Sequence, residues 1–578
     1  MCGIAGCVYS GNELSASWLD EAISKLWHRG PDTVGRGLLE SYTTGHPGHG
    51  YHLGQTRLAI CDVDPIATPY QYDYLQVVLA FNGEIYNWKE LQAELSDGTP
   101  WQSSCDAEVV ARAWRRWGPE CLSRFNGMFA MAIADQLTGD VVLVRDRAGV
   151  KPLYYLQTPG RLYFDSEAKA LPGPRYECDC EDVDALEFDC GSRTPFEGVF
   201  VLPPGTLLVL NPSDHELPPT VIPSAWWKMP TDIDSGMTWE SAVDELEALV
   251  CDAVRIRMTP EVPVAQLLSG GLDSAILQAV SGTDAKYCVT FDPDTAGSTR
   301  FDVLAEARAA ARDTAVTPVT FSCDDFVSAM PDIVCALDTP AIWTAAAQWF
   351  LFQQIRRDGY KVVLSGEGAD ELFCGYARYR VLWHLDRMRD DRALAEYGPT
   401  IETALGPQGV GAAPAKALLY RGTLPHPTAA IHRLFQQHGR HNLVRSLANT
   451  EFHSTMQVLL RILDRMSMAS GIEARTPFLD YRIVEFSARC PTEFLVTARE
   501  SKAVLREVAR RVGVPRSITD CVSKKGFTIP WPAWRHRIAE ELGEDVPENA
   551  VRGAWDRGLF VRWQKKLWRQ AFNLSAPE

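Results

Sequence analysis

The second residue of the chain is a cysteine, in the run Met1-Cys2-Gly3-Ile4-Ala5-Gly6. Removal of Met1 would leave the thiol and the α-amino group of Cys2 a few bonds apart. A thiol with a pKa of about 8.5 is mostly protonated at neutral pH, whereas an α-amino group with a pKa of about 7.7–8.0 can accept its proton directly or through a water molecule. The pair predicts a nucleophile that needs no histidine. The alternative is that Cys2 is a small buried residue of a first strand.

A glycine-rich loop, Ser269-Gly270-Gly271-Leu272-Asp273-Ser274, follows the apolar run 262–268 and precedes a helical segment expected from Ala275. Glycines let a backbone close around an anion, and a helix N-terminus adds positive potential. The carboxylate of Asp273 can hold a Mg²⁺ ion that shares the phosphate charge. The loop differs from the common nucleotide loops G-x-x-x-x-G-K-[ST] and G-x-G-x-x-G. It predicts a phosphate cradle, and the alternative is an ordinary turn.

A second loop of this kind, 365–371, follows the buried run 361–364. Its three carboxylates, Glu367, Asp370 and Glu371, repel one another unless a cation or solvent absorbs their charge. In open parallel sheets, ligands bind at the carboxyl ends of the strands, where both loops would lie. The two loops predict a shared magnesium-nucleotide site with Asp273 and Asp370 as metal ligands, and the alternative for the second is a solvated acidic turn.

Near the end of the chain, the run Ser523-Lys524-Lys525-Gly526-Phe527 offers cations that could stabilise developing negative charge. An isolated lysine pair is more often a solvated surface feature. Lys524 is therefore a candidate only in combination with the two glycine-rich loops.

The elements that would position these residues differ between the two halves of the chain. From residue 8 to about 210, short apolar runs alternate with turns, and strands are expected at 77–81, 128–133, 141–144, 153–155 and 162–164. Helices are expected at 88–95 and 106–117. Residues 211–230 are rich in proline and polar residues, as in a linker. Beyond them, runs at 262–268, 287–291, 316–321 and 361–364 alternate with helices, a pattern typical of a parallel sheet covered by helices. After about residue 380 the chain is expected to be mostly helical.

Length and composition limit the classes of function. With 578 residues, the chain should form at least two domains, and its net charge of −17 argues against a nucleic-acid partner. It has no apolar run long enough to span a membrane and no secretory signal, so a cytoplasmic location is expected. The fifteen cysteines are then expected to be free thiols. The spacing of Cys178, Cys180 and Cys190 does not favour a zinc site.

Along most of its length the sequence resembles the glutamine-dependent asparagine synthetases. The motifs that carry the resemblance are 1–6, 28–32 (HRGPD), 53–60 (LGQTRLAI), 81–87 (FNGEIYN), 145–155 (RDRAGVKPLYY), 269–274, 365–371, 466–469 (MSMA), 473–480 (EARTPFLD) and 524–527. The resemblance implies an N-terminal-nucleophile (Ntn) glutaminase domain of stacked β-sheets flanked by helices over residues 1–210. A linker at 211–235 would lead to an ATP-pyrophosphatase-type α/β synthetase domain at 236–578, with a largely helical C-terminal part.

The resemblance implies the following roles in the first domain. Cys2 would attack the side-chain amide of glutamine, form a thioester and release ammonia, with Asn82 and Gly83 as the oxyanion hole. Arg57 would pair with the α-carboxylate of glutamine, and Asp106 would receive its α-ammonium. The further glutamine-binding residues implied are Leu58, Ile60 and Glu84.

In the second domain the resemblance implies that a carboxylate attacks the α-phosphorus of ATP, giving an acyl-adenylate and pyrophosphate. Lys524 and Glu367 would be catalytic, and Mg²⁺ would bind Asp273 and Asp370. Ammonia from the first site would cross an apolar passage and displace AMP, and the protein could form a homodimer. The implied ATP-binding residues are Leu268, Ser269, Gly270, Gly271, Asp273, Ser274, Val289, Ser365 and Gly366.

Three residues depart from the family pattern. Gln55 stands where histidine is usual, Cys374 stands where glycine is common, and Ala107 interrupts a frequent Asp-Thr-Glu. The leading hypothesis is that aspartate is amidated to asparagine, and residues 338–348 with the stretch after Cys374 are expected to shape the acceptor pocket. One alternative is that the same machinery amidates or cyclises a different carboxylate in specialised metabolism. Another is that the chain is a glutaminase with an inactive binding domain.

Overall fold

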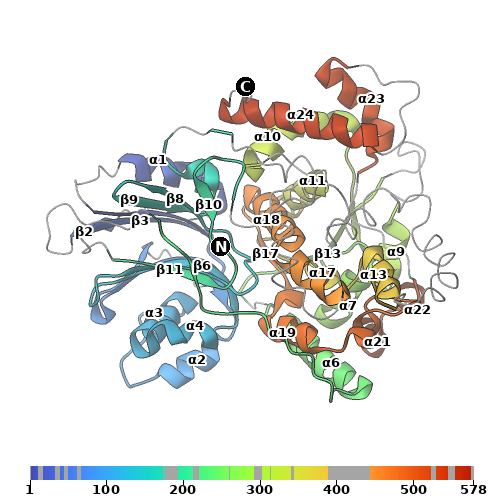
Figure 1. The fold of residues 1–578 in the computed structure, drawn as a ribbon, viewed down its shortest axis with the longest axis horizontal. Coiled ribbons are helices and arrows are strands. Elements are labelled where there is room, and N and C mark those ends of the chain that lie inside the picture. Colours follow the sequence, from blue (N-terminus) through green and yellow to red (C-terminus); the bar gives the residue numbers. More distant parts are fainter. Residues whose placement is uncertain are drawn as a thin grey trace.

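The computed structural model describes residues 2–10, 17–32, 39–43, 50–61, 67–173, 176–177, 193–211, 220–258, 261–291, 302–312, 314–339, 344–387, 443–521, 529–544 and 554–574. These residues form two six-stranded sheets and one five-stranded sheet, surrounded by helices (Figure 1). The two six-stranded sheets lie in the first half of the chain and are antiparallel. The five-stranded sheet lies in the second half and is parallel.

The first sheet contains the N-terminal strand. Its order is β10 (Val199–Val201), β8 (Tyr154–Thr158), β9 (Arg161–Asp165), β1 (Cys2–Tyr9), β3 (Gly50–Arg57) and β2 (Leu39–Thr43). Strand β1 is buried along its whole length and pairs with β3, so that Cys2 lies opposite Arg57. Helix α1 (Ser17–Lys25) buries Leu19, Ala22 and Ile23 against this sheet.

The second sheet packs on the first. Its order is β12 (Ser224–Ala225), β11 (Thr206–Leu210), β7 (Val141–Arg145), β6 (Gly127–Asp135), β5 (Val77–Ile85) and β4 (Tyr70–Tyr72). Ile4 and Leu53 of one sheet and Ala80 and Leu143 of the other belong to the core between them. Helices α2 (Trp88–Leu95), α3 (Asp106–Trp117) and α4 (Cys121–Arg124) accompany this sheet. The strands and helices expected here from the sequence are therefore present.

The parallel sheet has the order β15 (Thr317–Val319), β14 (Lys286–Val289), β13 (Val264–Leu267), β16 (Val362–Leu364) and β17 (Glu473–Arg475). Its helices are α6 (Trp239–Arg255), α7 (Leu272–Ser281), α9 (Leu304–Ala310), α10 (Cys323–Leu337) and α11 (Thr344–Arg357). Helix α7 begins at Leu272, three residues before the start expected from the sequence. Gly271 is its N-cap, and Asp273 in the first turn is favoured by the helix dipole.

The remaining described helices are α12 (Ala369–Leu372), α13 (Ala377–Arg387), α17 (Leu443–Phe452), α18 (Thr455–Ala469), α19 (Tyr481–Arg489), α20 (Thr492–Leu495), α21 (Ala503–Arg511), α22 (Arg516–Thr519), α23 (Trp531–Leu542) and α24 (Ala554–Phe572). Short 3₁₀ turns lie at Trp27–Arg29, Asp73–Leu75, Gly118–Glu120, Ala168–Ala170 and Pro477–Leu479. Among the described helices, none is both long and apolar enough to cross a membrane.

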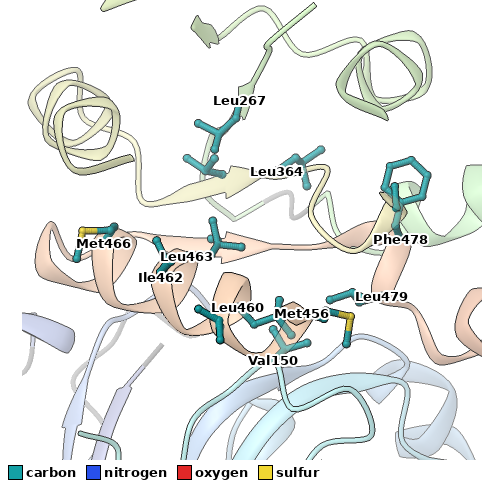
Figure 2. Packing of buried hydrophobic residues seen from close by; sticks show 14 of the residues in the cluster. Val150, Leu267, Leu364, Met456, Leu460, Ile462, Leu463, Met466, Phe478 and Leu479 are labelled. Carbon is teal, nitrogen blue, oxygen red and sulfur yellow. The ribbon is translucent and has the colours of Figure 1, made fainter. Parts of the chain in front are cut away.

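Helix α18 lies between the two halves of the molecule. Figure 2 shows Val150, from a turn of the first half, next to Met456 and Leu460 of α18, with Leu364 of the parallel sheet beyond the helix. All four side chains are buried and belong to one continuous core. The two halves therefore share an apolar layer. The division at residues 210 and 235 stays a prediction, and Ser224–Ala225 inside the predicted linker pair with β11.

Candidate active sites

Cys2 lies at the start of β1, between the two antiparallel sheets. Its side chain is 6% exposed, and its backbone N–H donates to Oδ1 of Asn82 at 3.2 Å. Asn82 belongs to β5 in the opposite sheet, so the sandwich itself brings the two residues together. The first strand thus places a thiol beside the buried amide side chain of Asn82.

The side chain of Asn82 has a free donor at this position. Asn82 is completely buried, and its Nδ2 has no hydrogen-bond partner among the described residues. Buried amide donors are almost always satisfied, so an unused N–H beside a nucleophile is a natural binding point for an oxyanion. At the next residue, Gly83, a Cβ atom would lie 2.3 Å from the carbonyl oxygen of Met128, which explains the requirement for glycine in this strand.

Two charged residues lie near Cys2. Arg57, opposite Cys2 in the sheet, is 3% exposed and donates through Nη2 to the carbonyl of Cys61 at 2.9 Å. Asp106 is the first residue of α3, and its Oδ2 accepts the N–H of Ile85 at 2.8 Å. Burial raises the pKa of Asp106 to about 6 despite that hydrogen bond. The predicted glutamine-binding residues Leu58 and Ile60, which follow Arg57, are also buried.

Glu84 connects this group of residues to the second half of the chain. Burial, and then repulsion from Asp106, raises the pKa of Glu84 to about 8. Arg475 of β17 opposes this rise, with its Nη2 3.7 Å from Oε2 of Glu84. Arg475 is itself fixed by Glu473 at 2.6 Å. No role was predicted for Arg475 or Glu473, because nothing local in the 473–480 motif indicates a contact with residue 84.

Arg29 forms a second connection between the halves. Its Nε donates to the carbonyl of Cys2 at 3.3 Å, and its Nη1 lies 2.7 Å from Glu167 and 2.9 Å from Asp464 of α18. Glu167 also lies 2.9 Å from Arg465, the next residue of α18. All five residues are buried, and buried charges are tolerated when they are paired in this way. The backbone of Cys2 is thus tied to the second half of the chain.

The two glycine-rich loops converge on one cavity of about 400 Å³ at the end of the parallel sheet. Its predicted lining residues are Ser269, Gly270, Gly271, Asp273, Ser274, Ser365, Gly366, Glu367 and Asp370. Leu268 and Val289, also predicted to bind ATP, are buried at the ends of their strands and are not among the residues that line the cavity.

The first loop has a conformation suited to an anion. Gly270 has a φ of 73°, and a Cβ there would lie 2.5 Å from Cβ of Glu306, so only glycine fits. Ser274 donates to the carbonyl of Gly271 at 3.1 Å and accepts the N–H of Ser269 at 3.3 Å. The N-terminus of α7 opens into the same cavity, where its potential favours negative charge.

The structure places an unpredicted residue, Lys502, between the two predicted metal ligands. Its Nζ lies 2.7 Å from both carboxylate oxygens of Asp273 and 2.8 Å from Asp370. Burial alone would lower the pKa of Lys502, but the two carboxylates raise it above its ordinary value. No sequence signal marks Lys502, which stands alone between Ser501 and Ala503.

The same two carboxylates could accept a magnesium ion. Asp273 and Asp370 point at one position, and Mg²⁺ commonly binds one or two carboxylates together with substrate phosphates. Among the described residues, no three His, Cys, Asp or Glu side chains gather around one point. The donor set therefore fits a metal that is completed by phosphate oxygens, and does not fit a site built from protein alone.

Helix α11 contributes two polar side chains to the lining of the cavity. Thr344 and Gln348 line it, and the buried Oγ1 of Thr344 and Oε1 of Gln348 have no hydrogen-bond partner among the described residues. Tyr376, which also lines the cavity, donates from its hydroxyl to Glu371 of the second loop. These groups could orient an acceptor molecule. Residues 340–343 of the predicted acceptor region lie outside the described residues.

The departures from the family pattern have clear local roles. Cys374 is buried and has a φ of 55°, a conformation that favours glycine. Gln55 accepts the N–H of Phe81 through Oε1 at 2.9 Å, next to Asn82. Ala107 is completely buried in the first turn of α3. None of the three removes a charged group from either pocket.

Some predicted residues lie outside the described part of the chain. These are Lys524 and its neighbour Lys525, and the cysteines Cys178, Cys180 and Cys190. The roles considered for them stay predictions. The described cysteines are free thiols.

Two protein-family models match the chain. A family model described as asparagine synthase matches residues 245–573, and one described as glutamine amidotransferase domain matches residues 1–221. The glutamine-hydrolysing asparagine synthetase 1 of Bacillus subtilis is 28% identical over 590 residues, covering 94% of this chain and 89% of that protein. A putative glutamine-hydrolysing asparagine synthetase of Mycobacterium tuberculosis is 28% identical over 593 residues, covering 92% and 88%.

A more distant relative has a different name. A Gibberella zeae protein named amidase chry2 is 24% identical over 614 residues, covering 94% of this chain and 89% of that protein. Among solved structures, the glutamine phosphoribosylpyrophosphate amidotransferase from B. subtilis, complexed with ADP and GMP, aligns with 55% of this chain and 81% of its own. The TM-score is 0.29 and the identity 16%, too remote to support a functional argument.

Proposed function

Because the chain belongs to the asparagine synthase family and is a glutamine-dependent amidotransferase of that type, we propose that it converts aspartate to asparagine. The predicted fold class is confirmed: an Ntn glutamine amidotransferase domain of stacked sheets precedes a mixed α/β domain with a helical C-terminal part. The acceptor, the site residues and the metal are parts of the proposal. The observation that carries it is that one chain holds Cys2 beside a free amide donor and, separately, two glycine-rich loops around one cavity.

In the first step, Cys2 attacks the side-chain carbonyl of glutamine, with its own α-amino group as the base after Met1 is removed. Nδ2 of Asn82 supports the role of oxyanion donor because it is buried beside Cys2 and no described residue accepts a hydrogen bond from it. Arg57 would bind the α-carboxylate, and Asp106 with Glu84 would bind the α-ammonium. The bound ammonium would favour the ionised forms of both acids, whose pKa values burial raises in the free protein.

In the second step, the aspartate side chain attacks the α-phosphorus of ATP, with the loop 269–274 around the leaving pyrophosphate. Lys502 is the described cation best placed to neutralise charge that develops on the phosphate, because it lies between Asp273 and Asp370 at the cavity wall. The same two carboxylates would hold Mg²⁺, which would supply charge neutralisation at the phosphates, once the ammonium of Lys502 turns from them toward the phosphate. The role predicted for Lys524 stays a prediction.

Ammonia released at Cys2 must then reach the acyl-adenylate without being protonated. The apolar layer that α18 forms between Val150 and Leu364 supports a protected route, since neutral ammonia is not disfavoured by apolar walls (Figure 2). Delivery within the protein would also raise the effective concentration of ammonia at the adenylate.

The choice of aspartate follows the names of the bacterial relatives, and the amidase-named relative supports the alternative of another carboxylate acceptor. Thr344 and Gln348 would contact the acceptor in either case.

To distinguish aspartate from another acceptor, the full-length protein is incubated with glutamine, magnesium-ATP and one carboxylic acid at a time, and the amidated product is identified by mass. Asparagine formed with AMP and pyrophosphate supports the proposal. Glutamate release without asparagine, together with amidation of another acid, supports the alternative.

A further inference from the structure

Strand β17 is an edge strand of the parallel sheet, and Arg475 is its last residue. It pairs with β16, so that Arg475 lies beside Leu364. The carbonyl of Arg475 accepts the N–H of Ser365, which lines the nucleotide cavity, at 2.9 Å. The backbone of Arg475 is thus fixed in the sheet that supports the second site, whereas its side chain approaches Glu84 of the first half.

The guanidinium group of Arg475 is held in place by residues of the second half. It is buried, and Nε donates to Oε1 of Glu473 at 2.6 Å, while Nη1 donates to the carbonyl of Arg257 at 2.7 Å. The third nitrogen, Nη2, has no hydrogen-bond partner among the described residues and lies 3.7 Å from Oε2 of Glu84. Burial would lower the pKa of Arg475, but the charges of Glu473 and Glu84 raise it, so the side chain stays a cation.

The separation between Arg475 and Glu84 leaves an oxygen of Glu84 available. A distance of 3.7 Å is too long for a hydrogen bond but short enough for the two charges to attract each other. A close forked pair with arginine would instead occupy both carboxylate oxygens. Oε1 of Glu84 accepts the S–H of Cys61 at 3.3 Å, and among the described residues no hydrogen bond reaches Oε2. Oε2 can therefore bind the ammonium of a ligand while Arg475 stabilises the negative charge.

Glu84 needs a cation because most of its surroundings disfavour its charge. Burial, then Asp106 and Glu473, raise the pKa of Glu84, whereas Arg475 and the hydrogen bond from Cys61 lower it. The balance of these effects is a pKa of about 8. Without Arg475, Glu84 would keep its proton to a still higher pH, and a neutral carboxyl group attracts an ammonium poorly.

We propose that Arg475 is a positioning residue for glutamine: from the second half of the chain, it holds Glu84 as a carboxylate with one oxygen open to the α-ammonium of the substrate. This role rests on the proposed function, in which Glu84 binds that ammonium. Part of the glutamine site then comes from the synthetase half, whose strand β17 also supports the loop at Ser365.

The test measures glutamine binding by calorimetry in full-length protein that carries Cys2→Ala, so that no glutamine is consumed. Arg475→Met should weaken binding at pH 7 about tenfold or more, because loss of a charge this close raises the pKa of an acid by about one unit or more. The pH at which binding becomes tight should rise by the same amount. Arg475→Lys, which keeps the charge but not the planar fork, should lie between the two.

A double-mutant cycle with Glu84→Gln distinguishes this role from a structural one. If Arg475 acts through Glu84, Arg475→Met should change the affinity less than about twofold in protein that already carries Glu84→Gln. Arg378→Lys is the matched control, because Arg378 forms a buried ion pair with Glu451 within the second half, at 2.6 Å. It should leave the affinity for glutamine and its pH dependence within about twofold of the parent protein. The melting temperature shows whether each variant is folded.

A pH dependence that moves on loss of Arg475 only when Glu84 is present supports the proposal. The proposal is overturned if Arg475→Met binds glutamine like the parent protein, or if it weakens binding equally with and without Glu84→Gln. Should Arg475→Met not fold, an unchanged pH dependence in Arg475→Lys overturns it. These results leave the proposed function standing, whereas a wild-type protein that does not hydrolyse glutamine would overturn both.

Discussion

Replacement of Asn82 by alanine should strongly reduce glutamine hydrolysis at the first site and change the stability of the fold only slightly. Among the described residues, the side chain of Asn82 accepts one hydrogen bond, from the N–H of Cys2 at 3.2 Å, and its buried Nδ2 has no partner. Loss of the bond lowers the free energy of unfolding by about 1 kcal/mol, whereas removal of the unsatisfied donor raises it by about 1–3 kcal/mol. The small cavity left by the shorter side chain lowers the free energy of unfolding by a further amount of similar size. The net change in the free energy of unfolding should therefore be about 1 kcal/mol or less.

The effect on catalysis should be much larger. If Nδ2 of Asn82 stabilises the oxyanion, Asn82→Ala should lower kcat for glutamine hydrolysis about a hundred- to a thousandfold, or about 3–4 kcal/mol. Synthesis from added ammonia should be unchanged, because the second cavity is intact. The assays are glutamate release, ammonia-dependent pyrophosphate release and the melting temperature.

Asn87→Ala provides the matched control. Asn87 lies at the end of the same strand region and uses both ends of its amide, toward Arg124 and Asn126. Its replacement should lower stability and leave glutamine hydrolysis near the wild-type rate. The reasoning about Asn82 is refuted if Asn82→Ala hydrolyses glutamine like wild type, or if it loses ammonia-dependent synthesis to the same extent.

Four further outcomes are expected. Cys2→Ala should abolish glutamine use and spare synthesis from ammonia; equal loss of both activities would contradict separate sites. Lys502→Met should reduce pyrophosphate release about a hundredfold or more while glutamate release changes little, because it removes the cation between two carboxylates. The KM for glutamine should fall as pH rises from about 6 to about 8, since Glu84 must lose its proton before it attracts an ammonium; a flat profile would exclude this role. Cys374→Val should lower the melting temperature more than Cys374→Gly, because a β-branched residue is strained at a φ of 55°.

Much of the first half could be predicted from sequence, because its signals are local. Alternation of apolar residues and turns predicts the strands that the structure contains at β5 to β9, and the acidic first turn and basic last turn of α3 predict that helix. The start of α7 was predicted three residues too late. Leu272, Asp273 and Ser274 look like part of a loop, but Gly271 caps the helix, and its dipole favours Asp273 in the first turn.

Residues of the candidate sites could be predicted from sequence only where they belong to a recognisable motif. Cys2, Asn82 and the loop 269–274 belong to recognisable runs, and the structure brings the predicted partners together. Lys502 could not be predicted, because a lone lysine has no pattern, and its contact with Asp273 depends on the packing of α21 against α7. The approach of Arg475 to Glu84 depends in the same way on how the edge strand β17 meets the first half.

Transfer of the glutamine amide nitrogen is the most direct measure of the proposed coupling between the two sites. The full-length protein is incubated with glutamine labelled with ¹⁵N at the amide, magnesium-ATP and aspartate, and the products are analysed by mass spectrometry. The proposed function predicts asparagine labelled at its amide, with one AMP and one pyrophosphate for each labelled molecule. Labelled ammonia without ATP turnover, or AMP and pyrophosphate without labelled asparagine, would contradict it.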